Sequence, residues 1–136
     1  RSAMPEDRRQ RMQRLLKVQE QLHRIEEWRL AEAQQEHDGI VRDQEELIQS
    51  LNADAGLQGL FVDAAARRLR TLAARELESG QVKDAQAQRV LAEGARRGVA
   101  ERLFAAATRE ARRAEEESQL QDATERVAAQ APRKII

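Results

Sequence analysis

The chain of 136 residues contains no cysteine and no tyrosine, and it has only one tryptophan, two phenylalanines and two prolines. Without cysteine it can form neither a disulfide framework nor a thiolate metal site. Its 14 leucines, 5 isoleucines, 7 valines and 2 phenylalanines make 28 residues, close to the roughly 20% below which a compact core is hard to build. No apolar run approaches the roughly 18 residues that span a bilayer. The composition therefore argues against a globular enzyme and against membrane insertion.

What is present is charge and alanine. Charged residues make up 35% of the chain, with 24 basic and 24 acidic side chains, and 24 further residues are alanine. This composition is typical of long helices and coiled coils. Such helices are ordered only where they share an apolar seam. With no cysteine to indicate an oxidising compartment, a cytoplasmic location is the default expectation.

A single helical domain is predicted over residues 5–131. Pro5 suits the first turn of a helix, and Glu6 and Asp7 favour the positive end of its dipole, so a first helix is expected over about 5–52. Residues 1–4 are interpreted as an expression scar followed by the natural start at Met4. A turn is predicted at about 52–57 and a second helix at about 58–130, ended by Pro132. Residues 132–136 are expected to fray.

Apolar residues of the first helix recur in alternating steps of three and four, the spacing of a coiled-coil seam. The predicted seam has two stretches: Leu15, Val18, Leu22 and Ile25, then Leu30, Ala33, His37, Ile40, Gln44, Leu47 and Leu51. Between Ile25 and Ala33 the spacing is eight instead of seven, which predicts a slip near Trp28. The second helix has a weaker pattern: Phe61, Ala65, Leu69, Leu72, Leu77, Val90, Leu91, Val99, Leu103 and Ala106.

The two helices are expected to form an antiparallel two-helix coiled-coil hairpin, because neither narrow stripe is stable alone. With the turn centred near Asp54, residue i faces roughly residue 109 minus i, which sets Leu22 opposite Ala87. About 25 residues of the second helix then extend beyond the start of the first. Each interior glycine costs about 1 kcal/mol against alanine, so a break at Gly80 into three helices is an alternative.

Residues suited to catalysis or to metal binding are scarce. His23 and His37 lie two heptads apart, too far to share a metal ion, and His23 with Glu27 supplies only two ligands. A two-helix fold has no enclosed pocket. We therefore expect a nonenzymatic protein without catalytic residues, metal or cofactor. Zero net charge and three aromatic residues also argue against nucleic acid as a partner.

Charge is balanced over the chain but segmented along it. Residues 1–20 carry a net +3, residues 21–56 a net −6, residues 89–113 a net +4 and residues 114–126 a net −4. In the expected pairing, both basic segments meet at the open end of the hairpin, which predicts binding to an acidic partner. The arginines concerned are Arg8, Arg9, Arg11, Arg14, Arg96, Arg97 and Arg102. Alternatively, they solvate the helix and pair with Glu93 and Glu101.

Three features together resemble the FliJ/YscO family, small stalk proteins of flagellar and injectisome type III export. They are the spacing of Leu15, Val18 and Leu22, the sequence GLQGLF after the turn (56–61), and the acidic stretch EEESQLQDATER (115–126). The resemblance covers nearly the whole chain and includes the longer second helix. Members of this family form an antiparallel two-helix coiled coil similar to the central rotor subunit of rotary ATP synthases.

The resemblance implies a stalk whose open end enters the ring of the hexameric export ATPase and whose rod contacts the membrane export gate, with export chaperones as further partners. The seven arginines above would then face the ATPase. The gate contact would lie early in the second helix, at Phe61, Ala65, Leu69 and Leu72. Such a stalk is cytoplasmic and peripheral to the inner-membrane export apparatus. The flagellar and injectisome branches are not separated, and a generic coiled-coil scaffold, a tether or a peripheral-stalk subunit is the alternative.

Overall fold

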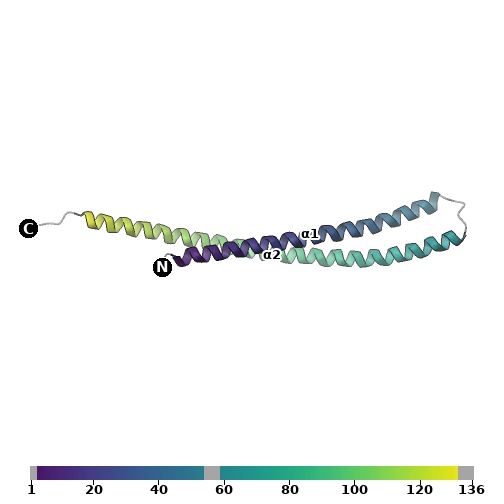
Figure 1. The fold of residues 1–136 in the computed structure, drawn as a ribbon, viewed down its shortest axis with the longest axis horizontal. Coiled ribbons are helices and arrows are strands. Elements are labelled where there is room, and N and C mark those ends of the chain that lie inside the picture. The colour runs from purple at the N-terminus through teal and green to yellow at the C-terminus, as the bar shows by residue number, and fades with distance from the viewer. Residues whose placement is uncertain (1–2, 54–58, 132–136) are drawn as a thin grey trace, which may run out of the picture. The chain divides into compact units, whose positions relative to one another are not determined.

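The structure, a computed structural model, describes residues 3–53 and 59–131. Over these residues it contains two helices and no strand: α1 (Ala3–Ala53) and α2 (Gly59–Gln130) (Figure 1). The helices pack against each other, so the predicted all-α helical hairpin is confirmed. The first helix begins two residues before Pro5, and its end at Ala53 takes in the start of the predicted turn. The rest of that turn and the predicted frayed tail lie outside the described residues.

The second helix passes through Gly80, Gly94 and Gly98 without interruption. None of these glycines has a positive φ angle, so each has an ordinary helical backbone. The three-helix alternative is therefore wrong.

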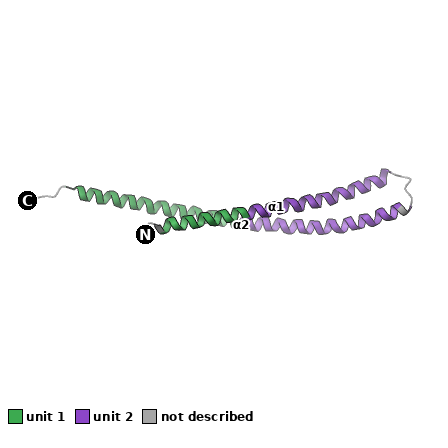
Figure 2. Ribbon diagram, in the orientation of Figure 1, with its two compact units in different colours: residues 1–21, 95–136 green, residues 22–94 purple. Residues whose placement is uncertain are grey.

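The chain divides into two units, each containing a segment of both helices (Figure 2). Unit 1 comprises residues 1–21 and 95–136, and unit 2 comprises residues 22–94. Within each unit the α1 segment packs against the α2 segment in the antiparallel direction. His37 contacts Ser79 and Glu26 contacts Gln86 in unit 2, whereas Arg8 contacts Glu110 in unit 1.

The seam residues of α1 are regularly spaced from the first turns to the last. Buried or half-buried residues recur in steps of three and four at Arg9, Met12, Leu16, Gln19, His23, Glu26, Leu30, Ala33, His37, Ile40, Gln44, Leu47 and Leu51. The stretch predicted from Leu30 to Leu51 is confirmed. The stretch from Leu15 to Ile25 is wrong, because its four residues are 36–55% exposed, and the seam has no slip near Trp28.

The physical reason is the continuity of the helix. The apolar residues between Leu30 and Leu51 set the heptad phase, and an uninterrupted helix keeps that phase unless extra residues shift it. In the first half of α1 the phase selects polar residues such as Gln19 and Glu26. The more apolar stripe from Leu15 to Ile25 lies one residue earlier at each step, and it remains exposed to solvent.

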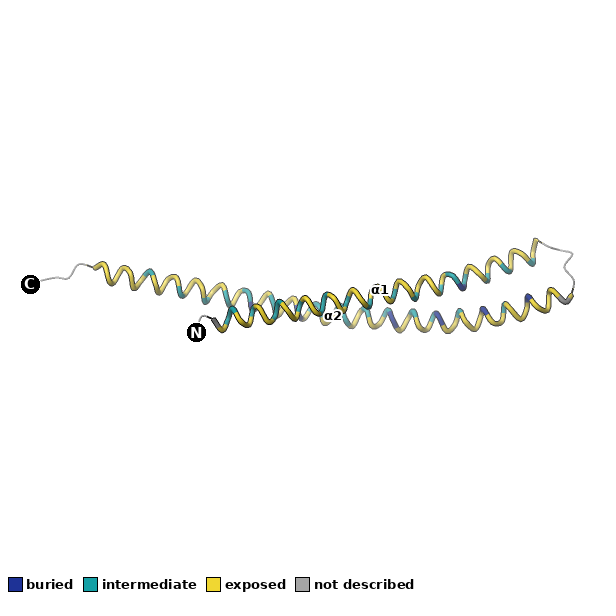
Figure 3. The backbone as a smooth tube through the Cα atoms, viewed as in Figure 1, coloured by how far each residue is buried: buried dark blue, intermediate teal, exposed yellow. Residues whose placement is uncertain are grey.

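The seam of α2 has the same uninterrupted heptad spacing. It consists of Ala65, Leu69, Leu72, Glu76, Ser79, Lys83, Gln86, Val90, Glu93, Arg97, Ala100, Phe104, Ala107, Ala111, Ala114 and Ser118. Figure 3 shows the most buried of these positions as spaced dark bands along α2. The predictions for Ala65, Leu69, Leu72 and Val90 are confirmed. The other predicted members are exposed and lie off the seam: Phe61, Leu77, Leu91, Val99, Leu103 and Ala106.

The register of the two helices differs from the predicted one by about a heptad. For the contacting residues His37 and Ser79 the residue numbers add up to 116, instead of the predicted 109. The pairing of Leu22 with Ala87 is therefore wrong. In unit 1 the contact of Arg8 with Glu110 gives a sum of 118. By these two sums the start of α1 is level with residues 113–115, and α2 continues for about 15–17 residues to Gln130, instead of 25.

Candidate functional site

Unit 1 contains all seven arginines that the sequence assigned to partner binding. The α1 segment from residue 3 to 21 has five basic and three acidic residues, and the α2 segment from 95 to 113 has six basic and two acidic residues. The register sets Arg14 level with Arg102. Arg96 and Arg97 are level with Gln19 and Glu20, farther from Arg8 than the predicted pairing places them. The basic residues therefore extend along unit 1 instead of converging at its end.

Arg8, Arg9 and Arg97 form ion pairs with glutamates. Arg8 Nη1 lies 3.7 Å from Glu110 Oε2 on the other helix. Arg9 Nε donates to Glu6 Oε1 at 3.0 Å, and Arg97 Nε donates to Glu101 Oε1 at 2.8 Å, each within one helix. The hydrogen bond from Arg9 lowers the pKa of Glu6, and the same bond raises the pKa of Arg9. The partner of Arg97 is the predicted Glu101, so part of this cluster stabilises its own helices.

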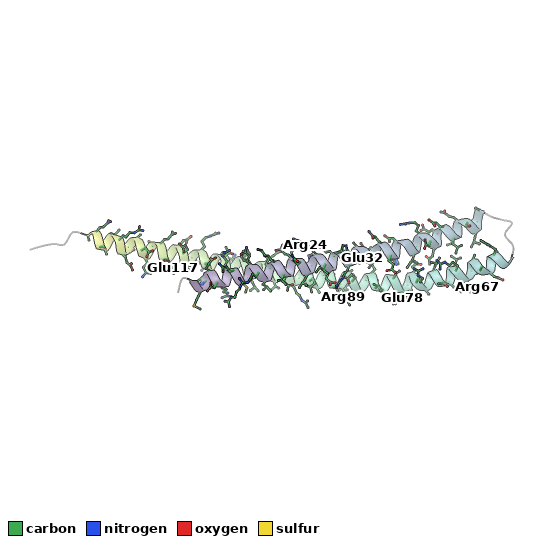
Figure 4. All side chains as sticks on the ribbon, viewed as in Figure 1. Arg24, Glu32, Arg67, Glu78, Arg89 and Glu117 are labelled. Carbon is green, nitrogen blue, oxygen red and sulfur yellow. The ribbon has the colours of Figure 1, made fainter. Side chains whose placement is uncertain are left out.

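The arginines best placed to meet a partner are Arg11, Arg14 and Arg102, which are exposed and have no ion pair among the described residues. The Arg102 guanidinium passes over Gly98, where an added Cβ atom would lie 3.6 Å from Nη1. A guanidinium offers a planar fork of donors that matches a carboxylate. Charged side chains project along both helices (Figure 4), so the excess of positive charge, rather than exposure, distinguishes this surface.

The predicted gate contact requires a correction. The side chains of Ala65 and Leu72 are 5% and 1% exposed, and Leu69 is half-buried between them on the same seam. These residues pack against α1 in unit 2, so they are not accessible to a partner while the helices are paired. Phe61, at 49% exposed, and its neighbour Val62, at 47%, are large apolar residues of this segment that are accessible.

A feature that the sequence did not indicate is the pairing of each histidine with a glycine across the helices of unit 2. A Cβ atom added at Gly80 would lie 3.5 Å from His37 Cε1, and one added at Gly94 would lie 3.4 Å from His23 Nε2. The two histidines are 14 residues apart, and so are the two glycines. The missing side chains therefore leave room for two imidazole rings at the helix interface. The equal spacing was the only signal available in the sequence.

The arrangement around His37 is not that of an activated serine. Ser79 Oγ donates to the backbone oxygen of Glu76 at 3.1 Å and lies 2.9 Å from His37 Nδ1. A hydroxyl has one proton to donate, so with that proton directed to Glu76, the tautomer of His37 that carries a proton on Nδ1 completes the contact by donating to Ser79 Oγ. A nucleophilic serine requires the opposite direction, with the hydroxyl donating to the imidazole. The pair thus satisfies two polar groups within the seam.

No other chemical centre is found in the part of the chain that the structure describes. His23 Nδ1 lies 3.5 Å from Glu27 Oε1, but no group of three or more histidine, aspartate or glutamate side chains there is arranged to hold a metal ion. An open hollow of about 410 Å³ beside His37 is bordered by Ala73, Leu77 and Gly80 among others. Neither helix has, among its described residues, a stretch long and apolar enough to cross a membrane.

Comparison of the chain with protein-family models, with curated protein sequences and with solved structures finds no match.

Proposed function

We propose that this protein is a nonenzymatic coiled-coil stalk of a type III protein export apparatus, and that the basic surface of unit 1 binds the hexameric export ATPase. The observation that carries the proposal is the placement of basic segments from both helices in one unit, with Arg11, Arg14 and Arg102 exposed. A binding surface built from two helices of a hairpin is the arrangement that the resemblance to the FliJ/YscO family implies.

The mechanism proposed for such a stalk depends on asymmetry. A single hairpin inside a ring of identical subunits presents its arginines to only some subunit interfaces at a time. Charge-assisted hydrogen bonds to acidic groups would favour one state of those interfaces over the others. The stalk would thereby couple the state of the ring to the export gate. For the gate contact we propose the exposed Phe61 and Val62, in place of the buried residues near them.

The test is co-purification with a hexameric export ATPase, together with its rate of ATP hydrolysis. Wild type is compared with the triple variant Arg11→Glu, Arg14→Glu and Arg102→Glu. We expect the wild type to bind at low salt and to stimulate hydrolysis, and the variant to lose both properties. Because exposed charges contribute only tenths of a kcal/mol to stability, the helical circular dichroism of the variant should equal that of the wild type.

A matched control has the same change of charge at three exposed arginines of unit 2: Arg67→Glu, Arg68→Glu and Arg70→Glu. It should retain ATPase binding. Equal loss in both variants would show that net charge, and not this surface, drives the interaction. If the wild type neither binds nor stimulates at low salt, the stalk proposal fails and the alternative of a coiled-coil scaffold or tether takes its place.

A further inference from the structure

The outer face of α2 in unit 1 has apolar residues at both of its ends. Val99 and Leu103 are 48% and 38% exposed, and Leu120 and Val127 are each 69% exposed. Along the chain these four residues are 4, 17 and 7 positions apart. In a helix with a heptad repeat, these intervals place all four side chains on one side. The seam toward α1 runs along a different side, through Ala100, Phe104 and their heptad equivalents. A second apolar face thus lies next to the seam, on the outside of the hairpin.

The first helix widens this face near Leu103. The ion pair between Arg8 and Glu110 shows which flanks of the two helices lie side by side in unit 1. Leu15 lies seven residues after Arg8, and Leu103 lies seven residues before Glu110. Because a heptad returns to the same side of each helix, Leu15 and Leu103 lie side by side as Arg8 and Glu110 do. Leu15 is 36% exposed and Val18, one helical step farther, is 55% exposed. The apolar surface at this end is therefore built from both helices.

The charges around this face are arranged in two halves of opposite sign. Residues 95–113 have six arginines and two glutamates, a net charge of +4, whereas residues 114–126 have five acidic residues and one arginine, a net charge of −4. Around the centre of the face, Arg109, Arg113, Glu116 and Glu117 are exposed and have no ion pair among the described residues. Glu117 is labelled in Figure 4. The face is complementary to itself when it is turned end to end.

We propose that this face binds the same face of a second copy of the chain in the antiparallel direction. Val99 and Leu103 of one copy then meet Leu120 and Val127 of the other, and residues 95–110 of each copy, which include Arg109, meet the acidic residues 114–126 of its mate. The twofold axis passes between residues 111 and 113, which makes the interface isologous. A parallel arrangement would instead bring like charges together, so the charges select the antiparallel one. The inference goes beyond the stalk proposal and does not depend on it.

The test is sedimentation equilibrium of the purified protein alone, over a wide range of concentration. One variant combines Arg109→Glu with Arg113→Glu, and a second combines Glu116→Arg with Glu117→Arg. Each variant by itself places like charges across the interface, and we expect its dimer Kd to rise at least about tenfold. An equimolar mixture restores both sets of opposite charges, so we expect it to form heterodimers about as tightly as the wild type dimerises.

The matched control pair has equivalent changes in unit 2: Arg67→Glu with Arg68→Glu, and Glu45→Arg with Glu46→Arg. These variants should dimerise like the wild type, and mixing them should change nothing. Leu120→Gln, at an exposed position, should weaken the dimer without changing helical circular dichroism. A wild type that is monomeric at every concentration overturns the proposal, as do charge variants that no mixing rescues. Because the swapped residues lie outside the seven-arginine set and no ATPase is present, the outcome is independent of the stalk test.

Discussion

At the residue scale, two polar residues of the α2 seam in unit 2, Gln86 and Ser79, each have a hydrogen-bond partner on α1. Gln86, only 7% exposed, donates through Nε2 to the backbone oxygen of Glu26 at 3.0 Å and to its Oε2 at 2.6 Å. His37 and Ser79 form a second hydrogen-bonded pair between the two helices, closer to the turn. Since a buried polar group without a partner costs about 1–3 kcal/mol, these bonds allow a polar seam to persist. They also favour one register, because a shift by one heptad would separate every pair.

At the glycines opposite the histidines, the effect of a substitution should depend on the size of the new side chain. At Gly80 a Cβ atom would be in ordinary van der Waals contact with His37, at 3.5 Å. Gly80→Ala should therefore be accommodated and should stabilise the protein by about 0.5–1 kcal/mol through helix propensity. Gly80→Leu should instead displace the imidazole, break its bond to Ser79 and destabilise the hairpin. Urea denaturation followed by circular dichroism measures both, and a destabilising alanine would contradict the packing described.

Two leucines five residues apart on α2 differ in burial, because one lies on the seam and the other on the exposed side of the helix. Leu72 is 1% exposed and Leu77 is 66% exposed. Leu72→Ala should lower the free energy of unfolding by about 2–4 kcal/mol, as for other buried large-to-small changes. Leu77→Ala, its control, should change it by less than about 0.5 kcal/mol. Equal effects in thermal or urea unfolding would show that the heptad phase of α2 is not the one described.

At the scale of the elements, the decisive property is that each helix keeps one heptad phase along its length. The stripe of Leu15, Val18, Leu22 and Ile25 is more apolar than the seam residues beside it, yet it is exposed. Burying it would require a local shift of phase near Trp28, which distorts the supercoil. The seam residues of α2 level with this stretch are Glu93, Arg97 and Ala100, so the more polar side of α1 faces polar and small residues there.

Register can be tested by disulfide formation, since the protein has no cysteine of its own. The variant His37→Cys with Ser79→Cys places two cysteines at positions whose side chains lie 2.9 Å apart, and under oxidation it should form a cross-link within one chain. The pair Leu22→Cys with Ala87→Cys, about a heptad out of register, should not. Gel migration without and with reductant distinguishes the products. Cross-links that form only between chains would contradict the hairpin.

At the scale of the whole molecule, the two helices differ in how much of their length is paired. The segment of α2 beyond about residue 115 has no α1 residue level with it in unit 1, and its residues are mostly exposed. Its apolar residues, Leu120 and Val127, do not contribute to the seam. The segment can therefore contribute to association while contributing little to the stability of the hairpin.

Deletion of residues 119–136 tests this division. At low protein concentration, where self-association is negligible, the shortened chain should melt within about 2 °C of the wild type, because a change of less than about 0.5 kcal/mol moves Tm by only a few degrees. At high concentration it should remain monomeric in sedimentation equilibrium. A large loss of thermal stability at low concentration would show that this segment is part of the folding unit.

The sequence by itself determined the helices, their ends and their hairpin topology. Proline, the acidic first turn and the three-and-four spacing act locally, and the seam from Leu30 to Leu51 was readable because its residues are mostly apolar. What only the tertiary structure decided was the phase of the seam before residue 30, the register and the role of the glycines. Before residue 30 the exposed stripe is more apolar than the seam, so hydrophobicity along α1 alone could not identify the side that faces α2. The arginine positions were visible in the sequence, but the ion pair of Arg8 with Glu110 forms only because the folded hairpin brings the two helices together.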